Sequence, residues 1–436
     1  MIEEVELCDN ISVDSEGNLC FAGYNTVELA EKYATPLYIV DENKIRSKIR
    51  AYKSAMSEYY NAESFPIFAS KAMSFKRMYK ILVEEDIGCD VVSCGEFYTA
   101  LQAGTDPKKV FYHGNNKTDE DIKFAIDNGM GYFVVDNYEE LISIDNYAKE
   151  KNIKQKILLR ITPGIDPHTL KAIDTGSIDC KFGFALETGQ AEEITALALK
   201  LDGIDLMGFH CHIGSQIFDA FPFIDTVDIM ISYLSDIRDK YGYIAKILNL
   251  GGGFAVRYVA SDPEFNIKKC ISDIGNAIHK KCNELKFPVP IIVHEPGRCI
   301  VADAGMTLYT VGNVKEIKDF KNFVSVNGGM GDNPRYALYG SEYTVTVANK
   351  ADKDKDFICT LAGKFFERGD LIFENIKIQK PEKGDVIAVM TTGAYNFSMA
   401  SNYNRFPRPA VVMLDEEKDY LAVKRETYED LIKNDI

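Results

Sequence analysis

The chain has 436 residues, of which 46% are hydrophobic and 27% are charged, and its formal net charge is −16. This length is enough for two domains, or for one barrel with an appended domain. The acidic balance argues against non-specific binding to nucleic acid or to anionic membranes, because such binding needs basic patches. We therefore expect neither partner, and an anionic cofactor or substrate would need a local cluster of hydrogen-bond donors.

The ten cysteines are scattered and form no CxxC pair and no His/Cys zinc spacing. We therefore expect reduced thiols, a cytoplasmic location and no metal site. The first six residues, MIEEVE, are acidic and lack the basic start of a secretory signal peptide. No stretch approaches the ~20 apolar residues needed to span a bilayer, so we expect no membrane-spanning helix.

The N-terminal region predicts short extended pieces at 11–13 and 19–22, followed by a strand at 37–40. Asp41 is placed to cap a long helix that runs through Tyr60.

From residue 65 onward, apolar runs of strand length alternate with stretches of helical periodicity. Eight runs predict strands, at 66–69, 89–92, 110–112, 132–135, 157–161, 206–209, 247–250 and 290–293. Helices are predicted at 74–86, 95–104, 119–128, 138–150, 189–201, 219–241 and 266–285. Eight such units in about 240 residues fit a closed (β/α)8 TIM barrel better than an open α/β sheet. Periodicity does not give the order of strands, so closure is a hypothesis at this point.

Beyond residue 305 the pattern changes to short β-like runs joined by turn-rich segments. These runs lie at 306–314, 323–326, 343–347, 358–361, 386–390 and 410–414, and no long amphipathic helix intervenes. We therefore predict a mostly β second domain, and we expect the N-terminal strands to join it. The predicted division is a barrel at 37–304 and a discontinuous β domain at 1–36 and 305–436.

The active sites of such barrels are built at the C-terminal ends of the strands. Those ends supply a varied set of polar groups and glycines: Lys71, Asp90 with Ser93, His113, Asp136, Arg160, His210 with His212, Gly251 to Gly253, and His294 with Glu295. Lys71 follows the apolar run FPIFA, and an amine at the rim of a buried sheet can lose its proton and form a Schiff base. The alternative is a solvated lysine that merely ends a strand.

Two further stretches suit an anionic ligand. The run LNLGGGF (248–254) would let backbone N–H groups approach a phosphate, although three glycines alone are more often a tight turn. In HEPGR (294–298), Pro296 suits a first helical turn, so Gly297 and Arg298 would lie at a helix start and Glu295 could pair with a ring nitrogen. The alternative is that Arg298 only bonds Glu295.

The run GFHCHIGSQ (208–216) places His210 and His212 two residues apart, so on a strand they share one face. A metal site would need a third ligand, and no His or Cys lies at suitable spacing. An imidazole stacked on a planar cofactor, with Ser215 donating to a phosphate, fits better.

Several motifs occur in a fixed order: FASKA around Lys71, HGNNK (113–117), FHCHIGSQ (209–216), GGGF (251–254), EPGR (295–298), DNPRYALY (332–339) and GAYNFSMASNYN (393–404). Together they resemble the diaminopimelate decarboxylases. These are a branch of the pyridoxal-phosphate decarboxylases, which combine an alanine racemase-like barrel with a β domain and also include ornithine decarboxylase. The resemblance covers nearly the whole chain, and its motifs are more specific to the superfamily than to one substrate.

The resemblance implies pyridoxal 5'-phosphate as the cofactor and a homodimer with shared active sites. It makes Lys71 the Schiff-base lysine, His212 the imidazole stacked on the pyridine ring, and Glu295 the partner of the pyridinium nitrogen. The implied cofactor contacts are Lys71, Asp90, His212, Ser215, Gly252, Gly253, Glu295, Gly297, Arg298 and Tyr395. Among these, the implied phosphate contacts are Ser215, Gly253, Gly297 and Tyr395. The implied substrate contacts are Arg298, Arg335, Tyr339, Glu367 and Tyr395.

The implied reaction is decarboxylation of meso-2,6-diaminopimelate to L-lysine and CO2, a step of lysine biosynthesis. A protonated ring nitrogen beside a carboxylate would make the cofactor an electron sink for the carbanion left by CO2. Two arginines and a phenol suit recognition of a second carboxylate.

One segment departs from the family pattern. Where the family has C-E-S-[GS]-D, supplied to the pocket by the partner subunit, this chain reads FERGD, with Phe366 for the cysteine and Arg368 for the serine. The family cysteine is placed to protonate the carbanion, which phenylalanine cannot do. Either Lys71 or water would then supply the proton, or the protein would run a different or slower reaction. Arg368 would pair with Glu367, recruit a more acidic substrate, or simply face solvent.

Cys94 is a smaller departure, because the family usually has glycine there, and we expect it only to pack. Two alternative functions remain open: decarboxylation of another D-configured or modified amino acid, and a catalytically weakened, cofactor-binding paralogue.

Overall fold

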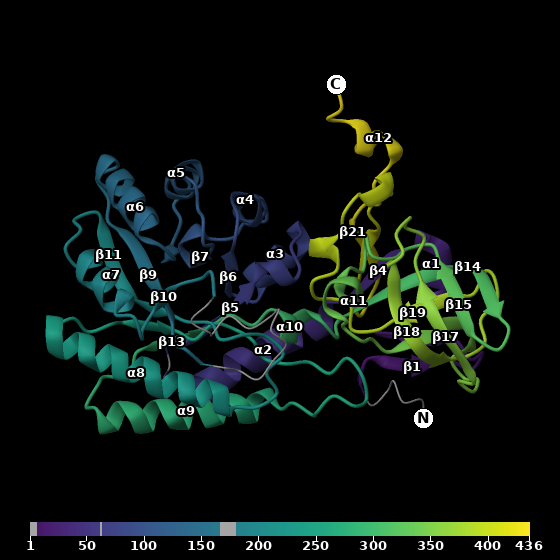
Figure 1. Cartoon of the computed structure of the whole chain (residues 1–436), viewed down its shortest axis with the longest axis horizontal. Coiled ribbons are helices and arrows are strands. Elements are labelled where there is room, and N and C mark those ends of the chain that lie inside the picture. The colour runs from purple at the N-terminus through teal and green to yellow at the C-terminus, as the bar shows by residue number, and fades with distance from the viewer. Residues whose placement is uncertain (1–6, 62, 166–179) are drawn as a thin grey trace. The chain divides into compact units, whose positions relative to one another are not determined.

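The computed structural model describes residues 7–61, 63–165 and 180–436, so the acidic start at 1–6 lies outside the described residues. The chain divides into two compact units, whose elements are labelled in Figure 1. The β unit comprises Met1–Ser47, Val256–Glu264 and Arg298–Ile436, and the barrel unit comprises Lys48–Ala255 and Phe265–Gly297.

The barrel unit contains eight parallel strands that close on themselves. Around the ring they are β5 (Phe65–Ala69), β6 (Gly88–Val91), β7 (Val110–Tyr112), β8 (Tyr132–Val135), β9 (Gln155–Thr162), β11 (Ile204–His210), β12 (Ile247–Asn249) and β13 (Ile291–His294). β13 pairs with β5 and β8 pairs with β9, so the ring has no break. The predicted TIM barrel is therefore confirmed, and the short β10 (Phe184–Ala185) adds to β9.

Helices connect these strands and lie outside them (Figure 1). They are α3 (Lys76–Glu84), α4 (Cys94–Gln102), α5 (Asp119–Asp127), α6 (Tyr138–Glu150), α7 (Gln190–Ala198), α8 (Phe221–Tyr241) and α9 (Ile267–Glu284). Side-chain caps set several starts: Ser93 accepts from the Glu96 N–H, and Thr118 forms a capping box with Asp121. All seven helices match the predicted ones.

The strands read as continuous apolar runs because their side chains are buried. Six residues from six strands form one packed cluster of the barrel: Ile67, Phe111, Val134, Leu158, Ile247 and Val293. Parallel strands covered by helices bury both faces, which removes the polar alternation of a half-exposed sheet.

The β unit is built on a second sheet. Its strands run in the order β18 (Leu371–Ile378), β17 (Phe357–Ala362), β15 (Lys321–Val326), β14 (Gly305–Ile317), β4 (Leu37–Asp41), β20 (Ala410–Leu414) and β21 (Asp419–Val423). β19 (Val386–Val389) pairs with β14 and with β16 (Val345–Val347). The second domain is mostly β, as predicted.

The N-terminal boundary differs from the sequence-based division, and residues 256–264 and 298–304, which that division placed in the barrel, also belong to the β unit. The strand β4 was assigned to the barrel, but it pairs antiparallel with β14 and parallel with β20, both in the β unit. The helix α2 (Glu42–Tyr59) that follows it begins in the β unit and ends in the barrel unit. The sequence of β4 is apolar and stands directly before the barrel pattern, so it resembles a barrel strand. Only its pairing partners show that it belongs to the sheet of the β unit.

The N-terminal segment packs on this sheet. The strands β1 (Ile11–Val13), β2 (Leu19–Phe21) and β3 (Tyr24–Asn25) form a small sheet of their own, followed by α1 (Thr26–Tyr33). Leu19, Phe21 and Leu29 share one core cluster with Leu308 of β14 and Val412 of β20.

Several short elements were not predicted. They are the strands β3, β10, β18 and β21 and the helices α1, α11 (Arg335–Tyr339) and α12 (Tyr428–Ile432). Within the residues that the structure describes, no helix combines the length and the apolar character that crossing a membrane requires.

Candidate active site

Lys71 lies directly after β5, in a 3-10 turn formed by Ser70–Ala72. This turn is fixed at its start, because the Ser70 N–H donates to Oδ1 of Asp90 at 3.2 Å and the Ala69 N–H donates to the Pro296 carbonyl at 3.1 Å. The Lys71 side chain itself is exposed. The structure therefore presents an accessible amine on a rigid support at the C-terminal end of the barrel strands.

Asp90 belongs to β6 and is 4% exposed. Burial, together with the negative charge of Glu295, raises the pKa of Asp90 well above its usual range, and Lys71 opposes that rise. The site thus holds two buried carboxyl groups whose pKa values are pushed in opposite directions.

Glu295 follows β13 and is the other carboxyl group. Its Oε1 accepts hydrogen bonds from His113 Nε2 and from Asn249 Nδ2, each at 2.8 Å, and its Oε2 lies 3.3 Å from His210 Nε2. Burial opposes its charge, but His113 and His210 outweigh burial and hold the pKa of Glu295 well below its usual range. Glu295 is therefore a buried anion at the C-terminal end of β13.

His212 lies in the loop after β11. The Gly252 N–H donates to His212 Nδ1 at 3.3 Å, so this nitrogen is the acceptor of the ring. Burial lowers the pKa of His212 well below its usual range, and the cations Lys71 and Arg160 lower it further. His212 is consequently a neutral imidazole.

The expectation that His210 and His212 share a strand face was wrong, because β11 ends at His210. His210 points to Glu295, whereas His212 contacts the glycine loop. Alternation of side chains applies only while the backbone stays extended in the sheet.

The glycine loops pack so closely that side chains do not fit. A Cβ added to Gly253, whose φ is +114°, would lie 2.4 Å from the Gly214 carbonyl oxygen, and one added to Gly252 would lie 2.2 Å from the Glu295 carbonyl oxygen. A Cβ on Gly297 would meet Ala69 Cβ at 2.8 Å. The loops after β12 and β13 thus have room only for backbone at these three glycines, as an anion-binding cradle requires.

Other strand-end residues pair with one another. Arg160 Nη1 lies 3.8 Å from Asp136 Oδ2, and its guanidinium stacks on Phe182 at 4.3 Å from the ring centroid. Lys117 of the HGNNK motif donates to Glu140 at 2.7 Å, and both side chains are 1% exposed. These pairs fix the loops after β7, β8 and β9.

In the β unit, arginines and tyrosines gather into an aromatic cluster. Arg298, the first residue of α10 (Arg298–Val301), donates to the Tyr258 hydroxyl at 2.8 Å and lies over the Tyr395 ring at 4.8 Å. Arg335 donates to the Tyr343 hydroxyl at 2.8 Å and lies over the Tyr258 ring at 4.7 Å. Both guanidiniums are buried, so this cluster is a preformed cationic group within an aromatic frame.

The FERGD segment is a surface loop with a rigid anchor. Asp370 is buried and accepts from the N–H groups of Met330 at 2.6 Å and Phe365 at 2.7 Å. Phe366, by contrast, is 94% exposed. The Arg368 side chain is also exposed, and its backbone N–H donates to the Glu367 carboxylate at 3.0 Å.

The two cysteines singled out from the sequence, Cys359 and Cys94, both pack against their surroundings. Cys359 of β17 is buried, and burial raises the pKa of its thiol to about 12. Cys94 Sγ lies 3.6 Å from the Tyr112 hydroxyl and 3.6 Å from the Asp121 carbonyl, so it packs as expected.

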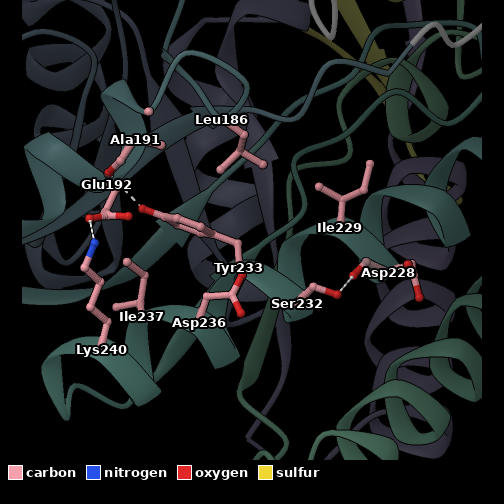
Figure 2. A pocket seen from close by; sticks show the side chains of 11 residues that line it. Leu186, Ala191, Glu192, Asp228, Ile229, Ser232, Tyr233, Asp236, Ile237 and Lys240 are labelled. Carbon is pink, nitrogen blue, oxygen red and sulfur yellow. Dashed lines mark hydrogen bonds and ion pairs between the residues drawn. The ribbon is translucent and has the colours of Figure 1, made fainter.

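A separate pocket of about 450 Å³ lies outside the barrel, between α7 and α8 (Figure 2). Its polar groups pair with one another: the Tyr233 hydroxyl donates to the Ala191 carbonyl at 2.8 Å, and Lys240 pairs with Glu192. Its lining includes none of the strand-end residues, so it is not the candidate site.

The sequence did not point to Asn249 as a functional residue. It is fully buried, donates to Glu295 and accepts from the Gly251 N–H at 2.9 Å, so it joins the carboxylate to the glycine loop. The available signal was an amide inside the apolar run LNL.

Comparison with known proteins places the chain in a family. Residues 42–302 match the model of the pyridoxal-dependent decarboxylases, pyridoxal binding domain. The diaminopimelate decarboxylase of Bacillus subtilis is 42% identical over 423 residues, which is 97% of this chain and 96% of that protein. That of Staphylococcus aureus is 40% identical over 429 residues, or 98% and 99% of the two chains.

Solved structures agree. A diaminopimelate decarboxylase from M. jannaschii superposes with a TM-score of 0.91 at 33% identity, covering 98% of both chains, and its complex with L-lysine has a TM-score of 0.90. The likeness extends over the β unit as well as the barrel. The chain therefore belongs to the diaminopimelate decarboxylase family of pyridoxal-dependent decarboxylases.

Proposed function

We propose that this protein decarboxylates meso-2,6-diaminopimelate to L-lysine and CO2, with pyridoxal 5'-phosphate as its cofactor. The observation that carries this proposal is that relatives named diaminopimelate decarboxylase align along the whole chain. The similarity thus includes Arg298, Arg335 and the rest of the β unit, where we place substrate recognition, and is not confined to the cofactor barrel.

The residues of the barrel unit fit the cofactor. Lys71 offers an accessible amine, Glu295 a fixed anion, and the loops around Gly252, Gly253 and Gly297 a backbone cradle. When bound, pyridoxal phosphate supplies an electron sink for the carbanion that loss of CO2 leaves behind.

Each of these groups then has one task. Lys71 would hold the aldehyde carbon of the cofactor, Glu295 its ring nitrogen and His212 one face of its ring. Asp90 and Gly252 would line the same site, and the phosphate would be held by Ser215, Gly253, Gly297 and Tyr395, with Arg298 beside them. Because His212 is a neutral ring, it can cover a cationic pyridinium without repelling it.

The β unit would recognise the end of the substrate that does not react. We assign its carboxylate to Arg298, Arg335 and Tyr339, and its amino group to Glu367, with Tyr395 also in contact. Planar guanidiniums suit carboxylates, and burial strengthens each pairing.

We further propose a homodimer in the cytoplasm. This proposal rests on the resemblance, in which a second copy supplies the segment that FERGD matches, and Phe366 of that segment is 94% exposed on an anchored loop. Ten free thiols suit a reducing compartment.

A second candidate function rests on the FERGD loop. Phe366 cannot donate a proton, and the exposed guanidinium of Arg368 would favour a more acidic substrate. These two residues favour decarboxylation of another D-configured or modified amino acid, or a weakened paralogue.

The test is release of CO2 by purified, cofactor-loaded protein with meso-diaminopimelate, D-lysine and D-ornithine side by side, and Lys71→Ala as the inactive control. Release with meso-diaminopimelate alone supports the first function. Release with another amino acid supports the second, and cofactor retention without any release supports the paralogue.

A further inference from the structure

We propose that His113 and His210 are positioning residues: they hold the Glu295 carboxylate in the orientation in which it pairs with the ring nitrogen of pyridoxal phosphate. This inference rests on the role proposed for Glu295. It assigns a purpose to two buried imidazoles for which the proposed reaction has no direct use.

The contacts converge on one carboxylate from separate strands. His113 follows β7, His210 ends β11 and Asn249 ends β12, and all three face Glu295 at the end of β13. His113 and Asn249 both bind Oε1 at 2.8 Å, whereas Oε2 has His210 Nε2 at 3.3 Å. Two firm hydrogen bonds on Oε1 fix the plane of the carboxylate and leave Oε2 as the oxygen available to another donor.

The two imidazoles support each other. Their rings meet edge to face, with centroids 4.8 Å apart and an interplanar angle of 71°. His113 is 6% exposed and His210 is 1% exposed, so neither ring is free to swing to solvent. The two packed imidazoles are therefore held in fixed positions beside Glu295.

Both rings are neutral, and this matters for the charge of the site. Burial lowers the pKa of His113, and it lowers that of His210 to about 4, although Glu295 pulls both upward. A neutral His113 donates Nε2–H to Glu295 without cancelling its charge. A cationic imidazole would neutralise Glu295 and leave nothing for a pyridinium to pair with.

No other charged group described around His113, His210 and Glu295 takes over the positioning of the Glu295 carboxylate. Asp90 adds negative charge beside Glu295, whereas the cation Arg160 lowers the pKa of both imidazoles and Lys117 lowers that of His113. The thiol of Cys211 stays protonated, because burial raises its pKa. His113, His210 and Glu295 thus form one anion with one neutral donor, His113, on Oε1 and a second neutral ring, His210, whose Nε2 lies 3.3 Å from Oε2.

His210 supplies a second, independent argument. Neither of its ring nitrogens makes an aligned hydrogen bond to any part of the chain that the structure describes. A buried polar group left unpaired costs about 1–3 kcal/mol, so a purely structural residue here would be better replaced by an apolar one. The burial of this imidazole is explained if Glu295 and its ligand need it.

The test compares two cofactors and does not depend on catalysis. Dissociation constants of pyridoxal phosphate and of 1-deazapyridoxal phosphate, which lacks the ring nitrogen, are measured by absorbance for the full-length apo-protein and its variants. Wild type should prefer pyridoxal phosphate. His113→Leu should lose about tenfold of that preference, and binding of the deaza analogue should change by less than about twofold.

Rescue separates hydrogen bonding from packing. His113→Gln keeps a donor of similar reach and should recover most of the preference. Should His113→Leu fail to fold, His113→Asn, whose shorter amide does not reach Glu295, must show the same selective loss. His210→Leu should lose preference as well, by less than His113→Leu, because its contact is longer.

Glu295→Gln is the control that separates the role of Glu295 from the role of His113. Glu295→Gln should abolish the preference; if it does not, the role proposed for Glu295 itself is wrong. If Glu295→Gln abolishes it but His113→Leu weakens both cofactors equally, Glu295 acts as proposed and His113 is merely structural, which overturns this inference.

Discussion

The substitution Asn249→Asp tests the electrostatics of the site with almost no change of shape. Asn249 donates Nδ2 to Oε1 of Glu295 at 2.8 Å and accepts from the Gly251 N–H through Oδ1. The new carboxyl group would keep the second bond and replace the first by a clash of like charges.

The expected loss of stability is set by the less costly of two outcomes: the new carboxyl group stays charged and repels Glu295, or it becomes protonated. At an effective dielectric constant of about 20, two charges 2.8 Å apart repel by about 6 kcal/mol. Protonating the new group instead costs about 1.4 kcal/mol for each pH unit above its ordinary pKa of about 3.9, or about 4 kcal/mol at pH 7. Protonation is cheaper, so we expect the variant to be about 4 kcal/mol less stable at pH 7.

The sign of the pH dependence is distinctive. The folded pKa of the new group is raised above its unfolded value, so the folded state binds more protons and the penalty grows as the pH rises. Relative to wild type, the variant should lose about 1.4 kcal/mol per pH unit between pH 5 and 7 and approach parity near pH 4. The measurement is urea unfolding of the apo-protein, followed by circular dichroism across this range.

Asn283→Asp is the matched control, because Asn283 is exposed on α9 of the same unit. It should change stability by less than about 0.5 kcal/mol at every pH. A penalty for Asn249→Asp that is the same at pH 5 and pH 7 would indicate lost packing, and no penalty would show that Asn249 does not hold an ionised Glu295.

Three further substitutions test other parts of the account. Phe366→Cys should raise turnover markedly if reprotonation is slow, whereas Phe320→Cys, also on an exposed side chain, should not; unchanged or lower turnover for Phe366→Cys contradicts the idea. Gly253→Ala should weaken pyridoxal phosphate binding at least about tenfold, because its Cβ would lie 2.4 Å from the Gly214 carbonyl oxygen, and unchanged affinity would refute a backbone cradle. Arg335→Lys should raise KM for meso-diaminopimelate by about tenfold or more with little change in kcat, since a lysine cannot replace a planar guanidinium; a loss confined to kcat would contradict its binding role.

The elements of the barrel were predictable because their signals are local. Each strand reads as an apolar run, and helix starts carry caps such as Ser93 and Thr118. Ring closure was not local: it depends on the pairing of β8 with β9 and of β13 with β5, which no periodicity records.

Individual residues of the candidate site could be named from the sequence, but their arrangement in space could not. Lys71, His212 and Glu295 were recognised one by one, but the convergence of His113, His210 and Asn249 on one carboxylate follows from the order of strands around the ring. The assignment of β4 to the barrel was wrong for the same reason. Its apolar sequence suits either sheet, and only its pairing with β14 and β20 places it in the β unit.

The products formed from meso-diaminopimelate are the most direct test of the proposed function. The purified, cofactor-loaded protein is incubated with this substrate alone, and CO2 and the chirality of the lysine are measured together. We expect one L-lysine for each CO2 released by the wild-type protein, and neither product from Lys71→Ala. Absence of CO2 from a protein that retains its cofactor, or formation of D-lysine, would contradict the proposed function.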